Sequence, residues 1–307
     1  MRLATFRHEG RTRTGIVDGE QVRPFLDDPG MLEIIETGWA GRGTASGVPL
    51  KDVQLLAPLR PGSIRDFVAF EEHVEGVRRS IDGSAGVPEA WYAAPTFYFT
   101  NPHTVLGPDD EVPFPATSVA RDFELEVAAV IGPDQRIFGY TIFNDWSARD
   151  LQSREMKVSL GPAKGKDFAS TLGPWIVTAD ELDPLKKDGF LDLWCSATVN
   201  DVEVGRDLLS NMGWTFETML VYAARDSRVL AGDVLGSGTV GNGGCLAELW
   251  GRNGRQDPPP LRDGDVVTLT VEGIGSLTNR VATGPSFDQL PGVRRRDPAR
   301  ARAERQH

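Results

Sequence analysis

RDFELEVAAVIG, residues 121–132, alternates acidic and apolar side chains before it becomes fully apolar. This alternation predicts a β-strand, in which residues i and i+2 point to the same face. Glu124 and Glu126 therefore lie side by side. Because two neighbouring carboxylates repel each other, they must be solvated or share a cation. Taken alone, a Glu-x-Glu pair is more often a solvent-facing strand surface than a metal site.

Further strand patterns recur along the chain and are separated by Gly-rich turns. Helical periodicity is pronounced in only one long segment, SNMGWTFETMLVYAARD (210–226). Many strands with few helices predict a strand-dominated α+β fold, with a mixed β-roll or barrel as its main domain. The strand patterns are PTFYFTN (95–101), IFGYTIFND (137–145), GPWIVTAD (173–180), LDLWCSATVN (191–200) and DGDVVTLTVEGIG (263–275).

Changes in composition divide the chain into three parts. Residues 1–58 combine short strand patterns, turn dipeptides and one short helix, which predicts a small β-rich domain. The Pro-rich segment APLRPG (57–62) is the expected linker to the main domain, residues 59–290. Residues 291–307 form a basic tail without apolar periodicity, so we expect this tail to be disordered.

The charge of the chain limits the classes of partner. Its 307 residues carry a formal net charge of -11, with a pI near 4.9. Nucleic acids and anionic membranes require a basic footprint, so neither is expected as a partner. Cys195 and Cys245 are too few for a disulfide framework or a thiolate metal site. The chain shows neither a signal-peptide pattern nor a run of roughly 20 apolar residues, which predicts a cytoplasmic protein.

Two more acids adjoin strongly apolar sequence. Asp145 ends the strand pattern GYTIFND (139–145), and Asp66 lies in IRDFVAF (64–70). A buried carboxylate is costly unless it meets a metal or a positive partner. Together with Glu124 and Glu126 these acids form a set of hard oxygen ligands, which suits Mg²⁺, Mn²⁺ or Ca²⁺ better than zinc.

The segment FNDWSARD (143–150) places Asp145 and Arg149 four residues apart. At this spacing the two side chains would form an ordinary surface pair on a helix, worth a few tenths of a kcal/mol. The alternative is that Asp145 faces a cation together with the other carboxylates. Asp150 is then expected to be structural.

Several ordered segments resemble the fumarylacetoacetate hydrolase superfamily, over about residues 60–285. The resemblance implies that Asp66, Glu124, Glu126 and Asp145 hold a divalent cation, with Mg²⁺ expected. It also implies an SH3-like N-terminal domain and a homodimer. The matching segments include DFVAFEEH (66–73), ELEVAAVIG (124–132), FNDWSARDLQ (143–152), GPAKGKDFASTLGPW (161–175), SNMGWT (210–215), GDVLGSGTVG (232–241) and LAEL (246–249).

By the same resemblance, the site acts on a small keto acid. His73 matches the general base, which Glu248 would orient, and Lys166 would stabilise charge in the transition state. Without the resemblance, His73 would more often be a surface or capping residue. The remaining positions match substrate contacts: Arg149, Gln152, Tyr98 and Thr239.

Three functions fit these residues. The first is Mg²⁺-dependent hydrolysis of a C–C bond in a 1,3-diketo acid, of fumarylacetoacetate or acylpyruvate type, which needs the base and a water. The second is decarboxylation, isomerisation or hydration of 2-oxo acids from aromatic catabolism on the same metal site. The third is a non-catalytic metal or ligand-binding protein. Substrate choice is expected to depend on residues 74–95, a suspected lid in which Arg78, Arg79 or Trp91 would meet the distal part of the substrate.

Overall fold

The structure is a computed structural model that describes residues 1–303. Twelve strands form the principal sheet, and ten of them follow one path from β4 to β7. The path runs β4 (Val48–Pro49), β3 (Gln21–Pro24), β2 (Arg11–Asp18), β1 (Arg2–His8), β14 (Ser170–Thr178), β12 (Ile137–Asn144), β11 (Leu125–Ile131), β19 (Val234–Gly236), β6 (Ile64–Phe67) and β7 (Phe97–Thr100). β5 (Gln54–Leu55) pairs with β1, and β8 (Val105–Leu106) pairs with β14.

A second sheet of five strands packs against the principal one. Its order is β18 (Val202–Leu208), β17 (Trp194–Val199), β20 (Val266–Val271), β21 (Gly275–Thr283) and β9 (Glu111–Phe114). Two small ribbons complete the strands, β10 (Arg121–Asp122) with β13 (Ser147–Ala148) and β15 (Lys186–Lys187) with β16 (Phe190–Leu191). The predicted strand-dominated α+β class is confirmed. Barrel closure is not, because over the described residues both large sheets are open at their end strands.

Seven α-helices connect or cover the sheets in residues 1–303. The helix predicted within residues 210–226 begins at Phe216, because Thr215 caps its N-terminus by accepting a hydrogen bond from the Thr218 amide. The helices are α1 (Met31–Thr37), α2 (Glu71–Asp82), α3 (Arg149–Met156), α4 (Ala179–Leu182), α5 (Phe216–Ala224), α6 (Leu246–Asn253) and α7 (Pro298–Ala303). Short 3-10 helices lie at Leu50–Asp52, Glu89–Ala93, Pro102–Thr104, Pro133–Gln135, Asp183–Leu185 and Leu209–Asn211.

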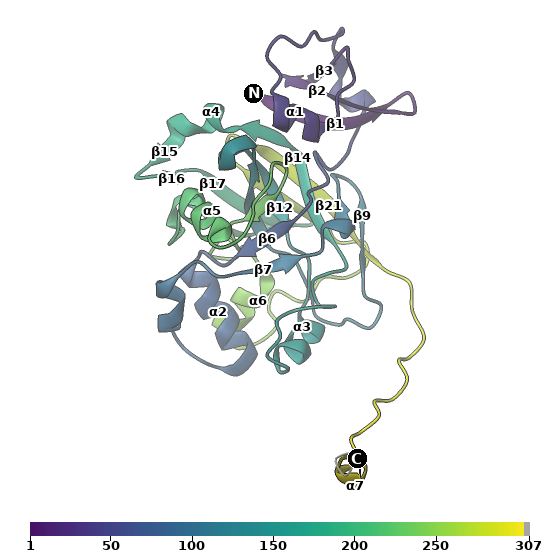
Figure 1. Cartoon of the computed structure of the whole chain (residues 1–307), viewed down its shortest axis with the longest axis vertical. Coiled ribbons are helices and arrows are strands. Elements are labelled where there is room, and N and C mark those ends of the chain that lie inside the picture. The colour runs from purple at the N-terminus through teal and green to yellow at the C-terminus, as the bar shows by residue number, and fades with distance from the viewer. Residues whose placement is uncertain (304–307) are drawn as a thin grey trace.

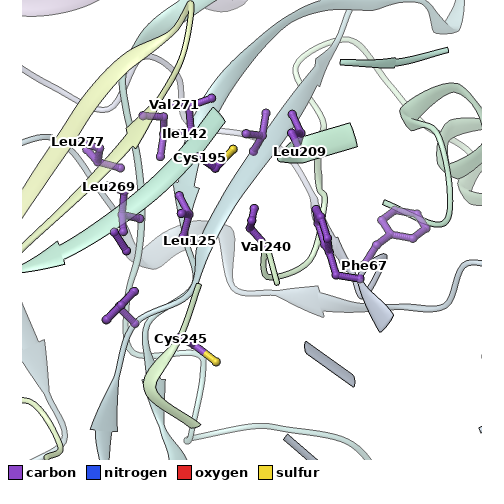
Figure 2. Close-up of a cluster of buried hydrophobic side chains, with 14 of the residues drawn as sticks. Phe67, Leu125, Ile142, Cys195, Leu209, Val240, Cys245, Leu269, Val271 and Leu277 are labelled. Carbon is purple, nitrogen blue, oxygen red and sulfur yellow. The ribbon is translucent and has the colours of Figure 1, made fainter. Parts of the chain in front are cut away.

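The fully apolar run of β11 is explained by burial of both strand faces. Leu125 and Val127 contribute to the core between the two sheets, part of which is shown in Figure 2. Ala128 and Val130 point to the opposite face and join a second core. Apolar residues of α1 cover that second core, so β11 has no solvent-facing side.

The N-terminal unit continues the principal sheet. Arg2 and Leu3 of β1 pair with Val177 and Ile176 of β14, so the first strand of the chain lies beside a strand of the main domain (Figure 1). The predicted division at residue 58 stays a prediction.

The described part of the tail after residue 284 leaves the body of the molecule and includes the short helix α7 (Figure 1). The predicted disorder of residues 291–307 falls partly outside the described residues, which end at 303. Over residues 1–303, none of the helices combines the length and apolar composition needed to cross a bilayer.

Close packing of α2 on α6 depends on two glycines. A Cβ at Gly251 would collide with the carbonyl oxygen of Gly76, and a Cβ at Gly76 would collide with the side chain of Glu248. We expect Gly251→Ala to lower the free energy of unfolding by about 1–3 kcal/mol, because the obstacle is backbone that cannot rotate away. Chemical denaturation measures the change, with Gly62→Ala as control because a Cβ there makes only ordinary contact. Equal stability of the two variants would contradict the close approach.

Candidate active site

Neighbouring strands bring four carboxylates to one place. β11 pairs with β12 and β19, and β19 pairs with β6, so the ends of these strands are adjacent. Asp66 lies on β6, Glu126 on β11, Glu124 directly before β11 and Asp145 directly after β12. One oxygen from each residue lies within 4.8 Å of the others. The structure thus brings together all of the residues that the sequence suggested as metal ligands.

Burial makes this cluster electrostatically costly. None of the four residues is more than 4% exposed. Burial raises the pKa of Asp66 well above its usual range, and repulsion from Asp145 raises it further. Burial, together with the charge of Asp66, does the same to the pKa of Glu126. The site therefore favours any positive charge that can enter it.

Lys166 supplies part of that positive charge. Its Nζ lies 2.5 Å from Glu124 Oε2 and 2.5 Å from Asp145 Oδ2. Burial alone would lower the pKa of Lys166, but Asp145 and Glu124 outweigh burial and raise it, so the side chain remains an ammonium ion. Burial would also raise the pKa of Glu124, but Lys166 and Arg149 hold it well below its usual range.

Three buried oxygens of the cluster remain without a hydrogen-bond donor. Asp66 Oδ1, Glu126 Oε1 and Asp145 Oδ1 receive no hydrogen bond from the described part of the chain. Gly236 borders them closely, since a Cβ at this position would lie 2.6 Å from Asp66 Oδ1 and 2.9 Å from Glu126 Oε2. Unpaired carboxylate oxygens from three residues are the donor set that a hard divalent cation prefers. The residues present therefore fit such a cation.

Arg149 occupies a different place from that of a surface helix pair. It begins α3, is 9% exposed, and its Nε lies 2.8 Å from Asp122 Oδ2. Its Nη2 lies 2.7 Å from Glu124 Oε1, and its Nη1 donates to Gln152 Oε1 at 3.1 Å. Arg149 and Gln152 both line the cavity at the cluster. Asp150 lies outside the site and accepts hydrogen bonds from Ser118 and Val119.

Asp122 is a site residue that the sequence reasoning missed. Besides Arg149, its carboxylate accepts hydrogen bonds from the amides of Leu246 and Ala247 at the start of α6. Asp122 thus joins the arginine to the helix that carries Glu248. The strand alternation could have revealed Asp122, because Asp122, Glu124 and Glu126 follow one another at intervals of two residues and so share a strand face.

His73 lines the same cavity from α2. Its Nε2 lies 3.8 Å from Glu124 Oε1, and its Nδ1 lies 3.6 Å from Cys245 Sγ. Burial lowers the pKa of His73 to about 4, and the charges of Arg149 and Lys166 oppose the effect of Glu124. The imidazole is therefore neutral near pH 7 and able to accept a proton.

Glu248 does not pair with His73 in the way that the family resemblance implied. Within residues 1–303, no hydrogen bond or ion pair joins the two side chains. Glu248 Oε1 instead lies 2.5 Å from Arg252 Nη2, one turn along α6. The side chain beside His73 Nδ1 is that of Cys245, the N-cap residue of α6.

Glu248 is fully buried, and burial raises its pKa to about 7 despite the charge of Arg252. An unfolded glutamate titrates near 4.3. Between these values the native state holds a proton that the unfolded state has lost, so stability falls as the pH rises from about 4.5 to 7. We expect Glu248→Gln to remove up to about 3 kcal/mol of this loss. Chemical denaturation of the wild type and the variant at pH 5 and pH 8 measures this difference. The same change in the free energy of unfolding between the two pH values for both proteins would contradict the prediction.

Tyr98 and Thr239 complete the positions that the sequence suggested. The Tyr98 hydroxyl donates a hydrogen bond to Asp145 Oδ2, and Thr239 lies in the loop after β19. Both line the cavity, whose volume is about 280 Å³.

The suspected lid, residues 74–95, places only some of its side chains at this cavity. α2 contributes Val77 as a lining residue. Trp91 is buried elsewhere and donates its Nε1 proton to the carbonyl of Val68 at 2.6 Å. Arg78 donates to the carbonyl of Gly86, and Arg79 pairs with Glu75 at 2.6 Å. These three residues are thus held by the lid segment or its surroundings and do not line the cavity.

Comparison with family profiles identifies two regions of the chain. Residues 63–282 match the family described as fumarylacetoacetate (FAA) hydrolase, C-terminal. Residues 1–58 match the family described as Rv2993c-like, N-terminal. All of the site residues described above lie in the first region.

Similar proteins include enzymes with different reactions. A fumarylacetoacetase from Oryza sativa subsp. japonica is 28% identical, over 76% of this chain and 71% of that protein. A solved fumarylacetoacetate hydrolase from Exiguobacterium antarcticum is 26% identical, with a TM-score of 0.71 over 92% of this chain and 99% of the other. A solved 5-carboxymethyl-2-hydroxymuconate delta-isomerase from Mycobacterium smegmatis is 27% identical, with a TM-score of 0.67 over 92% and 100%.

Proposed function

The chain belongs to the fumarylacetoacetate hydrolase family, and from this premise we propose that it is a Mg²⁺-dependent hydrolase that cleaves a C–C bond in a 1,3-diketo acid. The observation that carries the proposal is a neutral, cavity-lining His73 beside the buried carboxylate cluster. The proposal includes a small keto acid as substrate and a homodimer as the assembled form.

Asp66, Glu124, Glu126 and Asp145 would hold the cation. Mg²⁺ fits their hard oxygen donors, as Mn²⁺ does. When bound, such a cation acts as a Lewis acid that draws electron density from the oxygens of a keto acid. Lys166, which pairs with two of these carboxylates, would keep part of their charge neutralised while the substrate enters and leaves.

His73 would act on water. Hydrolysis adds a hydroxyl group to the acyl carbon and a proton to the departing carbon, so a group must take a proton from the attacking water. The neutral imidazole of His73 is suited to that step, since within residues 1–303 its Nε2 makes no hydrogen bond and lies 3.8 Å from Glu124 Oε1. Arg149, Gln152, Tyr98 and Thr239 would orient the substrate, since all four line the cavity.

A second function is favoured by the position of Glu248. Glu248 pairs with Arg252 and leaves His73 without a carboxylate to orient it for water activation. Isomerisation or decarboxylation of a 2-oxo acid adds no water and makes no use of such a dyad, and a 27% identical relative is an isomerase. The same carboxylate cluster would serve these reactions.

Labelled water separates the two functions. The purified protein is incubated with Mg²⁺ and a panel of acylpyruvates, fumarylacetoacetate and oxaloacetate in ¹⁸O-water, and the products are identified by mass spectrometry. We expect two acid fragments, one with a single ¹⁸O atom in its new carboxylate, and neither fragment in EDTA. Carbon dioxide release or an unlabelled isomer would contradict hydrolysis and support the second function.

A further inference from the structure

Besides the carboxylates and their charged partners, apolar side chains line much of the cavity. Its remaining walls are largely apolar and come from separate elements of the fold. α2 contributes Val77, β7 contributes Phe97, and α3 contributes Met156. Val68 and Pro162 lie in loops and extend the same wall.

Both cations that line the cavity are already paired. Arg149 is bound by Asp122 and Glu124, and Lys166 is bound by Glu124 and Asp145. Each lies at the cluster and not at the apolar wall. No further lysine or arginine lines the cavity among the described residues.

Three basic residues near the cavity in sequence have partners outside it. Arg78 follows Val77 directly but donates to the carbonyl of Gly86, while Arg79 pairs with Glu75. Lys164 lies near Pro162 and pairs with Asp167 at 2.8 Å. Lys157 follows Met156 and makes no ion pair within the described residues, but it does not line the cavity. Among the described residues, a second negative charge on a substrate would therefore find no unpaired cation in the cavity lining.

Resting on the proposed function, we propose that the end of the substrate remote from its 2-oxo acid group is apolar and uncharged. The substrate class is then an acylpyruvate with an alkyl or aryl acyl group, and a diketo acid with a second carboxylate is disfavoured. A carboxylate at the apolar wall would lose its water without gaining a partner. It would also approach a site that already holds several carboxylates, which repel it.

A matched pair of diketo acids tests this substrate class. Isocaproylpyruvate and succinylpyruvate have the same chain length and differ in their ends, which are an isopropyl group and a carboxylate of similar shape. With Mg²⁺ at fixed ionic strength, we expect kcat/KM to be at least about tenfold higher for isocaproylpyruvate than for succinylpyruvate. The reason is the free energy needed to bury the second carboxylate of succinylpyruvate without a partner.

Substitutions in the wall should change this preference. Val77→Lys adds a cation opposite the remote end of the substrate and should shift the ratio of kcat/KM at least about tenfold toward succinylpyruvate. Val77→Gln is the control, because it is polar and long but has no charge. Since Val77 is half-buried against the core, Met156→Lys provides the same test from α3, where the side chain is 44% exposed.

The outcomes separate the two proposals. Equal or better hydrolysis of succinylpyruvate by the wild type would overturn the substrate class and leave the hydrolase standing. Cleavage of neither acid would overturn the hydrolase. In that case both acids remain intact, and their binding to the Mg²⁺-loaded protein can be measured by isothermal titration calorimetry. Tighter binding of succinylpyruvate than of isocaproylpyruvate would overturn the proposed substrate class.

Discussion

Glu126→Gln is expected to lower kcat/KM by at least about a thousandfold, or about 4 kcal/mol of transition-state stabilisation. The amide keeps the size of the carboxylate, and its oxygen can still accept the hydrogen bond from the Gly238 amide. The substitution removes the negative charge that Glu126 would contribute to binding a divalent cation. Steady-state kinetics at saturating Mg²⁺ measures the loss.

The same substitution should stabilise the protein when metal is removed. Burial and the charge of Asp66 raise the pKa of Glu126, because the ionised carboxylate is costly in the metal-free site, and the neutral amide avoids this cost. In EDTA we expect a melting temperature at least as high as that of the wild type. On addition of Mg²⁺ or Mn²⁺ the wild type should gain stability and the variant should gain much less.

Asp150→Asn is the matched control for this prediction. Asp150 lies five residues after Asp145, but it bonds to Ser118 and Val119 outside the cluster. Its substitution should leave the stabilisation by metal intact. A Glu126→Gln variant that loses activity, melts early in EDTA and still responds fully to metal would show a folding defect and contradict the assignment of Glu126 as a ligand.

Local alternation predicted the strand-dominated fold and the shared strand face of Glu124 and Glu126. Asp66 and Asp145 joined the predicted cluster only through the apolar sequence beside them and the family resemblance. A strand places Glu124 and Glu126 on one face, and the apolar run that follows them is long enough to be buried on both sides, as β11 is. The alternation could not show whether the sheet closes into a barrel, because closure depends on which strands pair at the edges of the sheet. Pairing of β1 with β14 joins Arg2 to Val177, across the whole N-terminal unit and about half of the main domain.

Partner choice among charged side chains was the least predictable part of the site. Arg149 could be placed near Asp145 from their spacing, but the structure pairs it with Asp122 and Glu124. Glu248 likewise pairs within its own helix. The partner of each buried charged side chain depends on how the helices and strands pack around it. For example, Gly76 and Gly251 allow α2 to approach α6 closely. Spacing along one strand or helix carries no such information.

His73→Gln is expected to lower kcat for hydrolysis by about 10²–10⁴-fold, which is the usual contribution of a positioned general base. Glutamine keeps hydrogen-bonding capacity but cannot accept the proton of water near neutral pH. Stabilisation by Mg²⁺ should persist, because His73 lies 3.8 Å from Glu124 and is not one of the four clustered carboxylates. Cys245→Ala is the control, since it removes the neighbour of Nδ1 while leaving the base in place.

Proton exchange at the substrate shows which step His73 serves. In heavy water, loss of a proton from the carbon between the two carbonyl groups can be followed by NMR without any cleavage. If His73 activates water, the variant should lose hydrolysis and retain enzyme-dependent exchange in excess over the buffer rate. Loss of both would mean that His73 removes the carbon-bound proton itself. An isomerase requires that step and a hydrolase does not, so this result would favour the second function, in which Glu248 has no need to reach His73.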